Sequence, residues 1–142
     1  MISGPLSDYA GTVFRGRHFH AHQDVEIALP GFVVVSTVRH IASTMQFSSA
    51  EREEFSSVLV RLRYAQNHCG LKNVYLFQNE DTLDHFHLWM FPIYDWMLKF
   101  GKGPALLSAA INALRTGEQR YVASEALAVA RLLRAHVGAQ GE

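Results

Sequence analysis

A single long amphipathic segment constrains the fold of this chain more than any other part of the sequence. Ser48 and Glu51 form the signature of a capping box, in which two side chains satisfy the first backbone amides of a helix. Gly70 stands where glycine commonly ends a helix. The pattern predicts a helix over residues 49–69, and this helix must bury its apolar stripe. The stripe has helical spacing and consists of Phe55, Val58, Leu59, Leu62 and Ala65.

Extended segments stand on both sides of this helix. The β-branched run GFVVVSTV at 31–38 precedes it and VYLFQN at 74–79 follows it, so the helix must cross a sheet that contains both strands. Residues 12–24 are also typical of extended structure, with a turn at Gly16. HFHLWMFP at 85–92 comes after a turn short enough to make it an antiparallel neighbour of the preceding strand. We therefore expect an α+β fold, with an antiparallel sheet of about five strands and one long helix packed across it.

The C-terminal part of the sequence has a helical character over 104–115 and 124–137. We expect a single domain over residues 1–142, with its core at about 12–92 and a helical extension at about 93–142. The last helix is apolar enough to cover a partner subunit, or to pack on its own sheet. The sequence leaves both interpretations open.

Charge and composition exclude some classes of partner. The chain has 142 residues, with 13 Lys and Arg against 13 Asp and Glu. Because the net charge is zero, no overall field attracts the protein to nucleic acid or to an anionic membrane surface. The first ten residues carry neither the basic patch nor the apolar stretch of a secretory signal, and the single cysteine, Cys69, cannot form an internal disulfide. We therefore expect a cytoplasmic protein without a nucleic-acid or membrane partner.

Two short segments, HFHAH at 18–22 and HFHLW at 85–89, place histidines at alternate positions. In an extended chain alternate residues share one face, so His85, His87 and Trp89 lie together and the apolar residues between them face the other way. The apolar face should sit beneath the long helix and leave the histidines toward a cleft. A neutral imidazole can attack phosphorus or a carbonyl carbon without first losing a proton.

The order of these motifs resembles that of the histidine-triad (HIT) family of nucleotide hydrolases and transferases. The family has a Gly-His-(apolar run)-Pro-x-Arg/Lys-His segment and a His-φ-His-φ-His-φ-φ strand that is often closed by proline. Here GFVVVSTVRH, a capped helix, a strand ending in Asn79 and a His-x-His-x-x-x-x-Pro segment follow in that order, over about residues 12–92. The resemblance implies a HIT-like fold. It also implies a hydrolase or nucleotidyl transferase acting on a nucleoside phosphate or a dinucleoside polyphosphate, such as diadenosine polyphosphate, through a transient nucleotidyl-histidine.

The resemblance assigns roles to individual residues. The nucleophile falls on His87, which would attack the α-phosphorus of the nucleotide. His85 matches the first histidine of the triad, whose backbone carbonyl fixes the tautomer of the nucleophile. Asp24 occupies the place of the acidic residue that binds the ribose hydroxyls, and Asn79 that of a polar residue that contacts phosphate. His22, two residues before Asp24, corresponds to a position that lines the nucleobase pocket.

The other histidines near the site have alternative interpretations. His20 could contact a base as His22 does, and His18 is expected at the rim, but for both we favour a polar, solvated strand face. A metal held by His18, His20 and His22 is a third interpretation, although alternate residues of one flat strand converge poorly on an ion. His40 follows Arg39 as in the family's Arg/Lys-His pair, and we expect it to tie the end of its strand to the long helix.

Four features depart from the family pattern. Trp89 stands where the third triad histidine belongs, Phe32 replaces the histidine of Gly-His, and Thr37 replaces the proline. The turn EDTLD at 80–84 is shorter than the family's glycine-rich loop, with Thr82 as its one hydroxyl. An indole donates one hydrogen bond but cannot deliver a proton. The alternative to an active enzyme is therefore a catalytically weak or inactive nucleotide-binding module in which Trp89 lines the pocket.

The resemblance also concerns partners and cofactors. The histidine step requires no cofactor and we expect no metal site, although the substrate can arrive as its magnesium complex. The family commonly forms homodimers, so we expect a homodimer by analogy. A histidine-lined metal-binding protein is the least favoured alternative. The aromatic run 89–104 either borders the cleft or packs in the core or a dimer interface.

Overall fold

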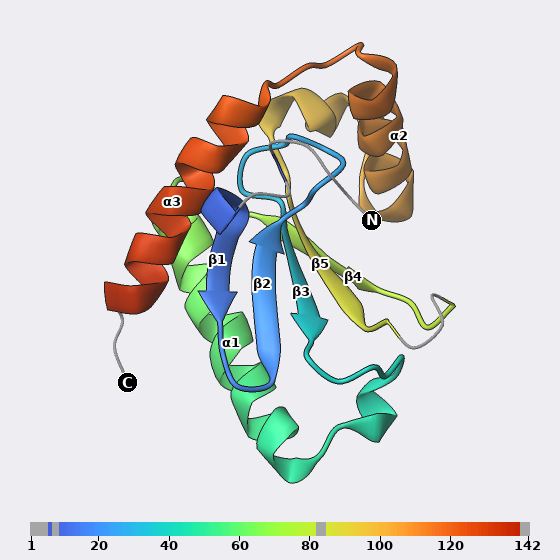
Figure 1. The fold of residues 1–142 in the computed structure, drawn as a ribbon. Helices are drawn as coiled ribbons and strands as arrows, with labels where there is room; N and C mark the ends of the chain where they lie inside the picture. The colour runs from blue at the N-terminus through green and yellow to red at the C-terminus, as the bar shows by residue number, and fades with distance from the viewer. Residues whose placement is uncertain (1–5, 7–8, 82–84, 140–142) are drawn as a thin grey trace.

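A computed structural model of the chain describes Leu6, residues 9–81 and residues 85–139. The described residues form one five-stranded sheet in the order β1-β2-β3-β5-β4, and all neighbouring strands are antiparallel (Figure 1). The predicted sheet is confirmed, except that the second histidine segment begins before its strand. The strands are β1 (Thr12–Arg15), β2 (Phe19–Gln23), β3 (Val33–Thr37), β4 (Val74–Gln78) and β5 (His87–Pro92).

The predicted long helix is α1 (Ser49–His68), which crosses behind the sheet in Figure 1. Its capping box forms as expected, because Ser48 Oγ accepts from the amide of Glu51 and Glu51 Oε1 accepts from the amide of Ser48. Gly70, just beyond the helix, has a φ of 89°, which glycine adopts without strain. The helix and the sheet bury a first hydrophobic core that includes Val58, Leu62, Ala65, Val33, Val35, Leu88 and Met90.

The last helix, α3 (Ala123–Ala139), packs on this same core. Leu133 is buried there together with Val13 of β1, and Figure 1 shows α3 running alongside β1 and α1. Arg134 Nη1 also donates to the carbonyl of Thr12 at 2.7 Å. Of the two interpretations of this helix, the structure shows the one in which it packs on its own sheet.

A second hydrophobic cluster lies on the face of the sheet turned away from α1, which we call the outer face. Phe32 and Phe91 are completely buried there. They are covered by the short 3-10 helix η4 (Asp95–Phe100) and by α2 (Gly103–Thr116). The aromatic run therefore packs in the core and closes part of the outer face. Its partly buried members that contact this cluster are Trp89, Ile93, Tyr94, Trp96 and Phe100.

Arg39 ties the end of β3 to the beginning of α1. Its Nε and Nη2 donate to the two carboxylate oxygens of Glu51, at 2.8 and 2.7 Å, and Nη2 also donates to the carbonyl of Gln46. Glu51 is buried, and its hydrogen bond with the guanidinium lowers the pKa of its carboxyl to about 2. We expected His40 to form this tie. That prediction is wrong, because the preceding arginine makes these contacts and His40 is exposed.

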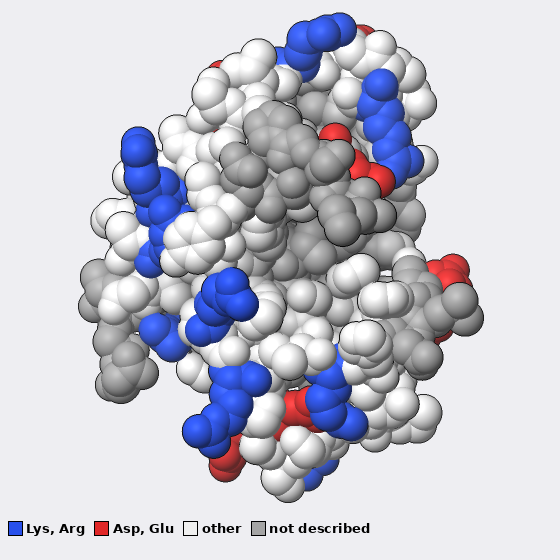
Figure 2. Space-filling model, viewed as in Figure 1, with Lys and Arg blue, Asp and Glu red and all other residues white. Residues whose placement is uncertain are grey.

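The surface of the described residues agrees with the balanced composition. Figure 2 shows basic and acidic side chains in small groups, and no large field of one sign covers the described residues on the face seen there. None of the described helices is both long enough and apolar enough to cross a membrane.

Candidate functional site

The two histidine segments meet on the outer face of the sheet. β3 lies between β2 and β5, and its pairing places Ser36 beside His20 on one side and beside His87 on the other. Paired residues point to the same face, so these three side chains form one row across the sheet. Neighbouring strands lie about 4.8 Å apart, which separates the backbones of His20 and His87 by about 10 Å. The two segments therefore border one surface rather than two separate sites.

His87 is the most accessible histidine of this row and of the next, since it is exposed whereas His20 and His22 are half-buried. Its ring stacks on that of His85, with 5.9 Å between the ring centroids and 21° between the planes. The ring of His85 in turn lies 5.8 Å from that of His40. These rings border a cavity of about 140 Å³, which is lined by residues 36–40 and 85–87.

Two effects lower the pKa of His87. Partial burial of the ring disfavours its charged form, and the charge of His85 has a smaller effect in the same direction. At neutral pH the ring is therefore an uncharged base whose lone pair can attack an electrophile. Among the described residues none forms a hydrogen bond with this ring, so the expected contact with the backbone carbonyl of His85 is not made.

Trp89, at the position of the absent third histidine, belongs to an aromatic cluster. Its ring centroid lies 5.3 Å from that of Phe32 and 5.6 Å from that of Phe77. Positions 32 and 89, where the family pattern has histidines, thus pack against each other as aromatic rings. Neither ring can deliver a proton to a leaving group. On the other side of His87 lies the imidazole of His85.

Asp24 lies in the loop after β2, and one of its oxygens is used locally. Its Oδ2 accepts from the amides of Glu26 at 3.1 Å and Ile27 at 2.7 Å, an arrangement by which aspartate stabilises a turn. Burial raises the pKa of Asp24, and these two hydrogen bonds lower it in part. Asp24 stands four residues beyond His20, roughly 13 Å along the strand direction. It does not line the cavity beside His87, so the structure does not bring the two residues into one described cavity.

The histidines of the first segment differ in their surroundings. The backbone amide of His18 donates to Glu54 Oε2 at 3.0 Å, and burial and a nearby arginine lower the pKa of His20. His22 Nδ1 donates to the carbonyl of Gln23 at 2.6 Å. The other side of the His22 ring packs against Gly11, where an added Cβ would lie 2.6 Å from the ring atom Cε1. Among the described residues, no group of three metal-binding side chains is placed to hold an ion.

Asn79 lies at the same end of the sheet as His87. Gln78, the last residue of β4, pairs with Leu88. Asn79 follows Gln78 and is therefore level with His87 in the antiparallel register. Asn79 is exposed, and its Oδ1 accepts from the amide of Asp81 at 3.4 Å. The part of the expected turn that includes Thr82 lies outside the described residues.

Comparison with known proteins adds the family context of this fold. No family model and no curated protein matches the sequence. The structure is similar to the diadenosine triphosphate hydrolase of Plasmodium falciparum, with a TM-score of 0.64 and 11% identity over 95% of this chain and 81% of that one. A zinc-bound histidine triad family protein from Mycobacterium smegmatis matches with a TM-score of 0.61 and 16% identity, over 91% of this chain and 84% of the other. The chain has the histidine-triad fold.

A third similar structure shows that this fold also occurs within a larger chain. The NitFhit protein of C. elegans matches with a TM-score of 0.61 and 13% identity over 89% of this chain, which spans only 27% of that protein. At these low identities the similarity concerns the fold. It confirms the predicted HIT-like sheet.

Two buried glutamines that the sequence analysis missed help to hold the histidine-triad sheet. Gln23 Nε2 donates to the carbonyl of Leu29 at 3.0 Å, inside the loop after β2. Gln66 Nε2 donates to the carbonyls of Gly31 at 3.0 Å and Met90 at 3.3 Å, which joins α1 to the turn before β3 and to β5. Gln66 continues the apolar stripe of α1, and a polar residue at such a position is a signal that was available in the sequence.

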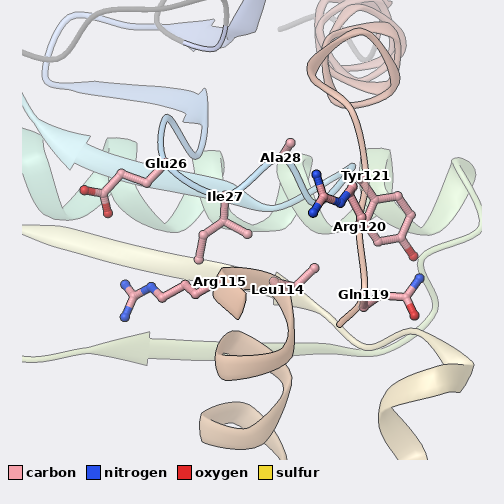
Figure 3. A pocket seen from close by; sticks show the side chains of 8 residues that line it. All are labelled: Glu26, Ile27, Ala28, Leu114, Arg115, Gln119, Arg120 and Tyr121. Atoms are coloured by element: carbon pink, nitrogen blue, oxygen red, sulfur yellow. The ribbon is translucent and has the colours of Figure 1, made fainter. Parts of the chain in front are cut away.

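Two larger cavities involve the helical extension of the histidine-triad core. The first, of about 590 Å³, lies between the loop after β2 and the end of α2, where Glu26 and Arg115 extend to the same side (Figure 3). The second, of about 710 Å³, lies between β4, Trp89 and the first turns of α2. No motif indicated either cavity, because the extension lies beyond the residues that carry the resemblance. The first cavity is lined by Glu26, Ile27, Ala28, Leu114, Arg115, Gln119, Arg120 and Tyr121.

Proposed function

We propose that this protein binds nucleotides and acts as a hydrolase or nucleotidyl transferase, with His87 as the nucleophile and a nucleoside phosphate or dinucleoside polyphosphate as the substrate. The observation that supports it most is the exposed imidazole of His87, which borders a cavity. The pKa of this imidazole is lowered. The similar Plasmodium protein is a diadenosine triphosphate hydrolase, which agrees with this class of substrate.

In the proposed reaction a ring nitrogen of His87 attacks the α-phosphorus. A P–N bond forms and the P–O bond to the leaving group breaks, and its electron pair goes to the leaving oxygen, which takes up a proton. Water then cleaves the P–N bond, which releases the nucleoside monophosphate and restores the imidazole. No metal ion or cofactor enters these steps, and the substrate can arrive as its magnesium complex.

The substrate in this proposal extends along the outer face. With its phosphorus at His87 and one phosphate oxygen near Asn79, a nucleotide passes Trp89 toward Asp24 and His22. The separation of roughly 13 Å along the strand is spanned by two side chains together with a ribose phosphate. The Oδ1 of Asp24 is the oxygen proposed to contact the ribose, because Oδ2 is engaged by the loop amides.

The proton for the leaving oxygen is proposed to come from His85. Its ring is stacked on that of His87 and lies on the side of the histidine row that is free of the aromatic cluster. An imidazole can act as a general acid, which an indole cannot. His85 thus takes over the task of the absent third histidine.

A nucleotide-binding module with little or no turnover is the second candidate. The packing of Trp89 against Phe32 favours it, since two positions that carry histidines in the family pattern are aromatic here. Such a module would be stabilised by AMP without releasing product.

Nucleotide release from AMP esters, AMP phosphoramidates and dinucleoside polyphosphates tests the function. We expect native protein to release AMP and the His87→Ala variant to be at least about a hundredfold slower. His68→Ala, which changes an exposed histidine at the end of α1, serves as the matched control and should retain the native rate. Equal rates for native protein and His87→Ala would remove the catalytic proposal. Stabilisation by AMP without turnover would leave the binding module.

Two further properties are proposed from the family resemblance. We propose a homodimer, to be measured by size-exclusion chromatography with light scattering, and a monomer at all concentrations would contradict it. A cytoplasmic location is also proposed, and fractionation of cells that express a tagged chain would test it.

A further inference from the structure

The largest cavity described lies on the β4 side of the strand that carries His87. Its volume is about 710 Å³, which falls within the range of small-molecule sites in proteins. Its floor includes Tyr75, Phe77 and Trp89 of the outer face, and the first turns of α2 form its wall. The backbone amide of Gly103 donates to the hydroxyl of Tyr75 at 2.8 Å, which fixes the beginning of α2 to the floor.

The chemistry of this cavity favours an uncharged, flat ligand. None of its lining residues is charged, and three are aromatic. Trp89 and Phe77 lie with their ring centroids 5.6 Å apart, so they offer π-faces and edges to a ring placed beside them. The side-chain polar groups of the lining are the hydroxyls of Tyr75 and Ser108 and the indole N–H of Trp89, and such a small number of polar groups suits a ring that carries one hydrogen-bonding atom.

The cavity lies near the proposed reaction site, because Trp89 lines it and belongs to the same strand as His87. Trp89 and His87 point to the same face of β5 and are two residues apart, so their Cα atoms are about 7 Å from each other. His22 and Asp24 lie on the β2 side of this strand, whereas the cavity lies on its β4 side. A substrate with its phosphorus at His87 can therefore extend its nucleoside toward Asp24 and its leaving group toward the cavity.

We infer that this cavity binds an uncharged aromatic ring of the leaving group, joined to the phosphorus by a short link. The inference rests on the proposed function, because only a catalysed reaction has a leaving group. The binding of an aromatic ring in the cavity does not itself depend on catalysis. The natural substrates would then be nucleotide esters or amidates of an aromatic alcohol or amine, and esters of small alkyl alcohols would be poor substrates.

Titration calorimetry with 2-naphthol, an uncharged aromatic alcohol, tests the ring site directly. We expect native protein and His87→Ala to bind it equally well. Ser108→Phe places a ring in the cavity from an exposed position of α2 and should raise the dissociation constant at least about tenfold. Asn112→Phe is the matched control, because Asn112 is exposed on the same helix and does not line the cavity. Phe77→Lys, which brings a charge to a partly exposed position on the floor of the cavity, is a second variant expected to weaken binding.

Three outcomes would overturn the inference. The first is the absence of 2-naphthol binding to native protein, and the second is unchanged binding in both Ser108→Phe and Phe77→Lys. The third is displacement of 2-naphthol by saturating AMP. Such displacement would mean that the cavity holds the nucleobase, or that it forms part of a dimer contact that AMP changes. If 2-naphthol binds but no ester is hydrolysed, the ring site stands and the proposed function falls. Faster cleavage of a naphthyl than of a methyl ester of AMP, abolished by Ser108→Phe, would support both.

Discussion

The two ends of the outer face differ in what their side chains do. At one end His87, His85 and Ser36 border a small, polar and accessible cavity. At the other end Phe32 and Phe91 are fully buried beneath η4 and α2. Both ends lie on or next to the same two strands, β3 and β5, and are only a few residues apart. One end of this surface is therefore open to solvent, and the other is filled by packed aromatic side chains.

Trp89 stands at the boundary between the two ends. It packs on Phe32, and it also lines the large cavity on the β4 side. A side chain at this position can therefore contribute to stability and to ligand binding together, but not to proton transfer.

The largest expected effect concerns stability. Phe32→Ala should lower the free energy of unfolding by about 3–5 kcal/mol, because it opens a cavity within the aromatic cluster. His87→Ala should change it by less than about 0.5 kcal/mol, since the side chain is exposed and forms no hydrogen bond with a described residue. Urea unfolding of both variants beside native protein measures the difference. Equal losses in the two variants would show that the ends of the face do not differ in this way.

The features of the fold that the sequence predicted are local, whereas those that it did not predict depend on contacts between distant parts of the chain. The capping box of Ser48 and Glu51, the alternation along β5 and the antiparallel pairing of β4 and β5 depend on local patterns, and the sequence predicted them. The meeting of the two histidine segments across β3 depends on the strand order, which no local pattern contains, and only the family resemblance, which assigns His22 and His87 to one nucleotide site, indicated it.

Contacts made by the C-terminal helices could not be read from the sequence for a related reason. The cover that α2 provides for Phe32 and the cavity beside Trp89 arise from residues far apart in the chain. The resemblance to the histidine-triad family ends near residue 92, so it implies no position for this helix. The sequence analysis expected His40, not Arg39, to connect β3 to α1. A motif match indicates which positions correspond, but it does not show which of two neighbouring side chains is long enough to make the contact.

A smaller effect is expected for the proposed proton donor. His85→Ala should lower kcat/KM about a hundredfold for AMP esters of alkyl alcohols, whose leaving oxygen needs a proton. For a p-nitrophenyl ester, whose leaving group departs as a stable anion, the loss should be less than about threefold. Steady-state kinetics with the two esters measures the contrast. A loss of the same size for both esters would assign His85 a role in binding or structure instead.

The smallest effect concerns the pH dependence of the rate. Because burial lowers the pKa of His87 below its ordinary value of 6.5, its ring stays neutral to a lower pH than a free histidine. The rate kcat/KM on the p-nitrophenyl ester should be constant above that pKa and should fall as the pH drops through it. The midpoint should lie below pH 6.5, and His85→Ala should move it slightly upward, since the second cause of the shift is then removed. A midpoint above 6.5 would contradict this account of the nucleophile.

The central claim is that the ring of His87 forms a covalent bond to phosphorus. Native protein mixed with a p-nitrophenyl ester of AMP and quenched within the first turnover should gain the mass of one AMP group, and peptide mapping should place that group on His87. The His87→Ala variant should gain none. Turnover without any adduct, or an adduct that persists in His87→Ala, would contradict the account.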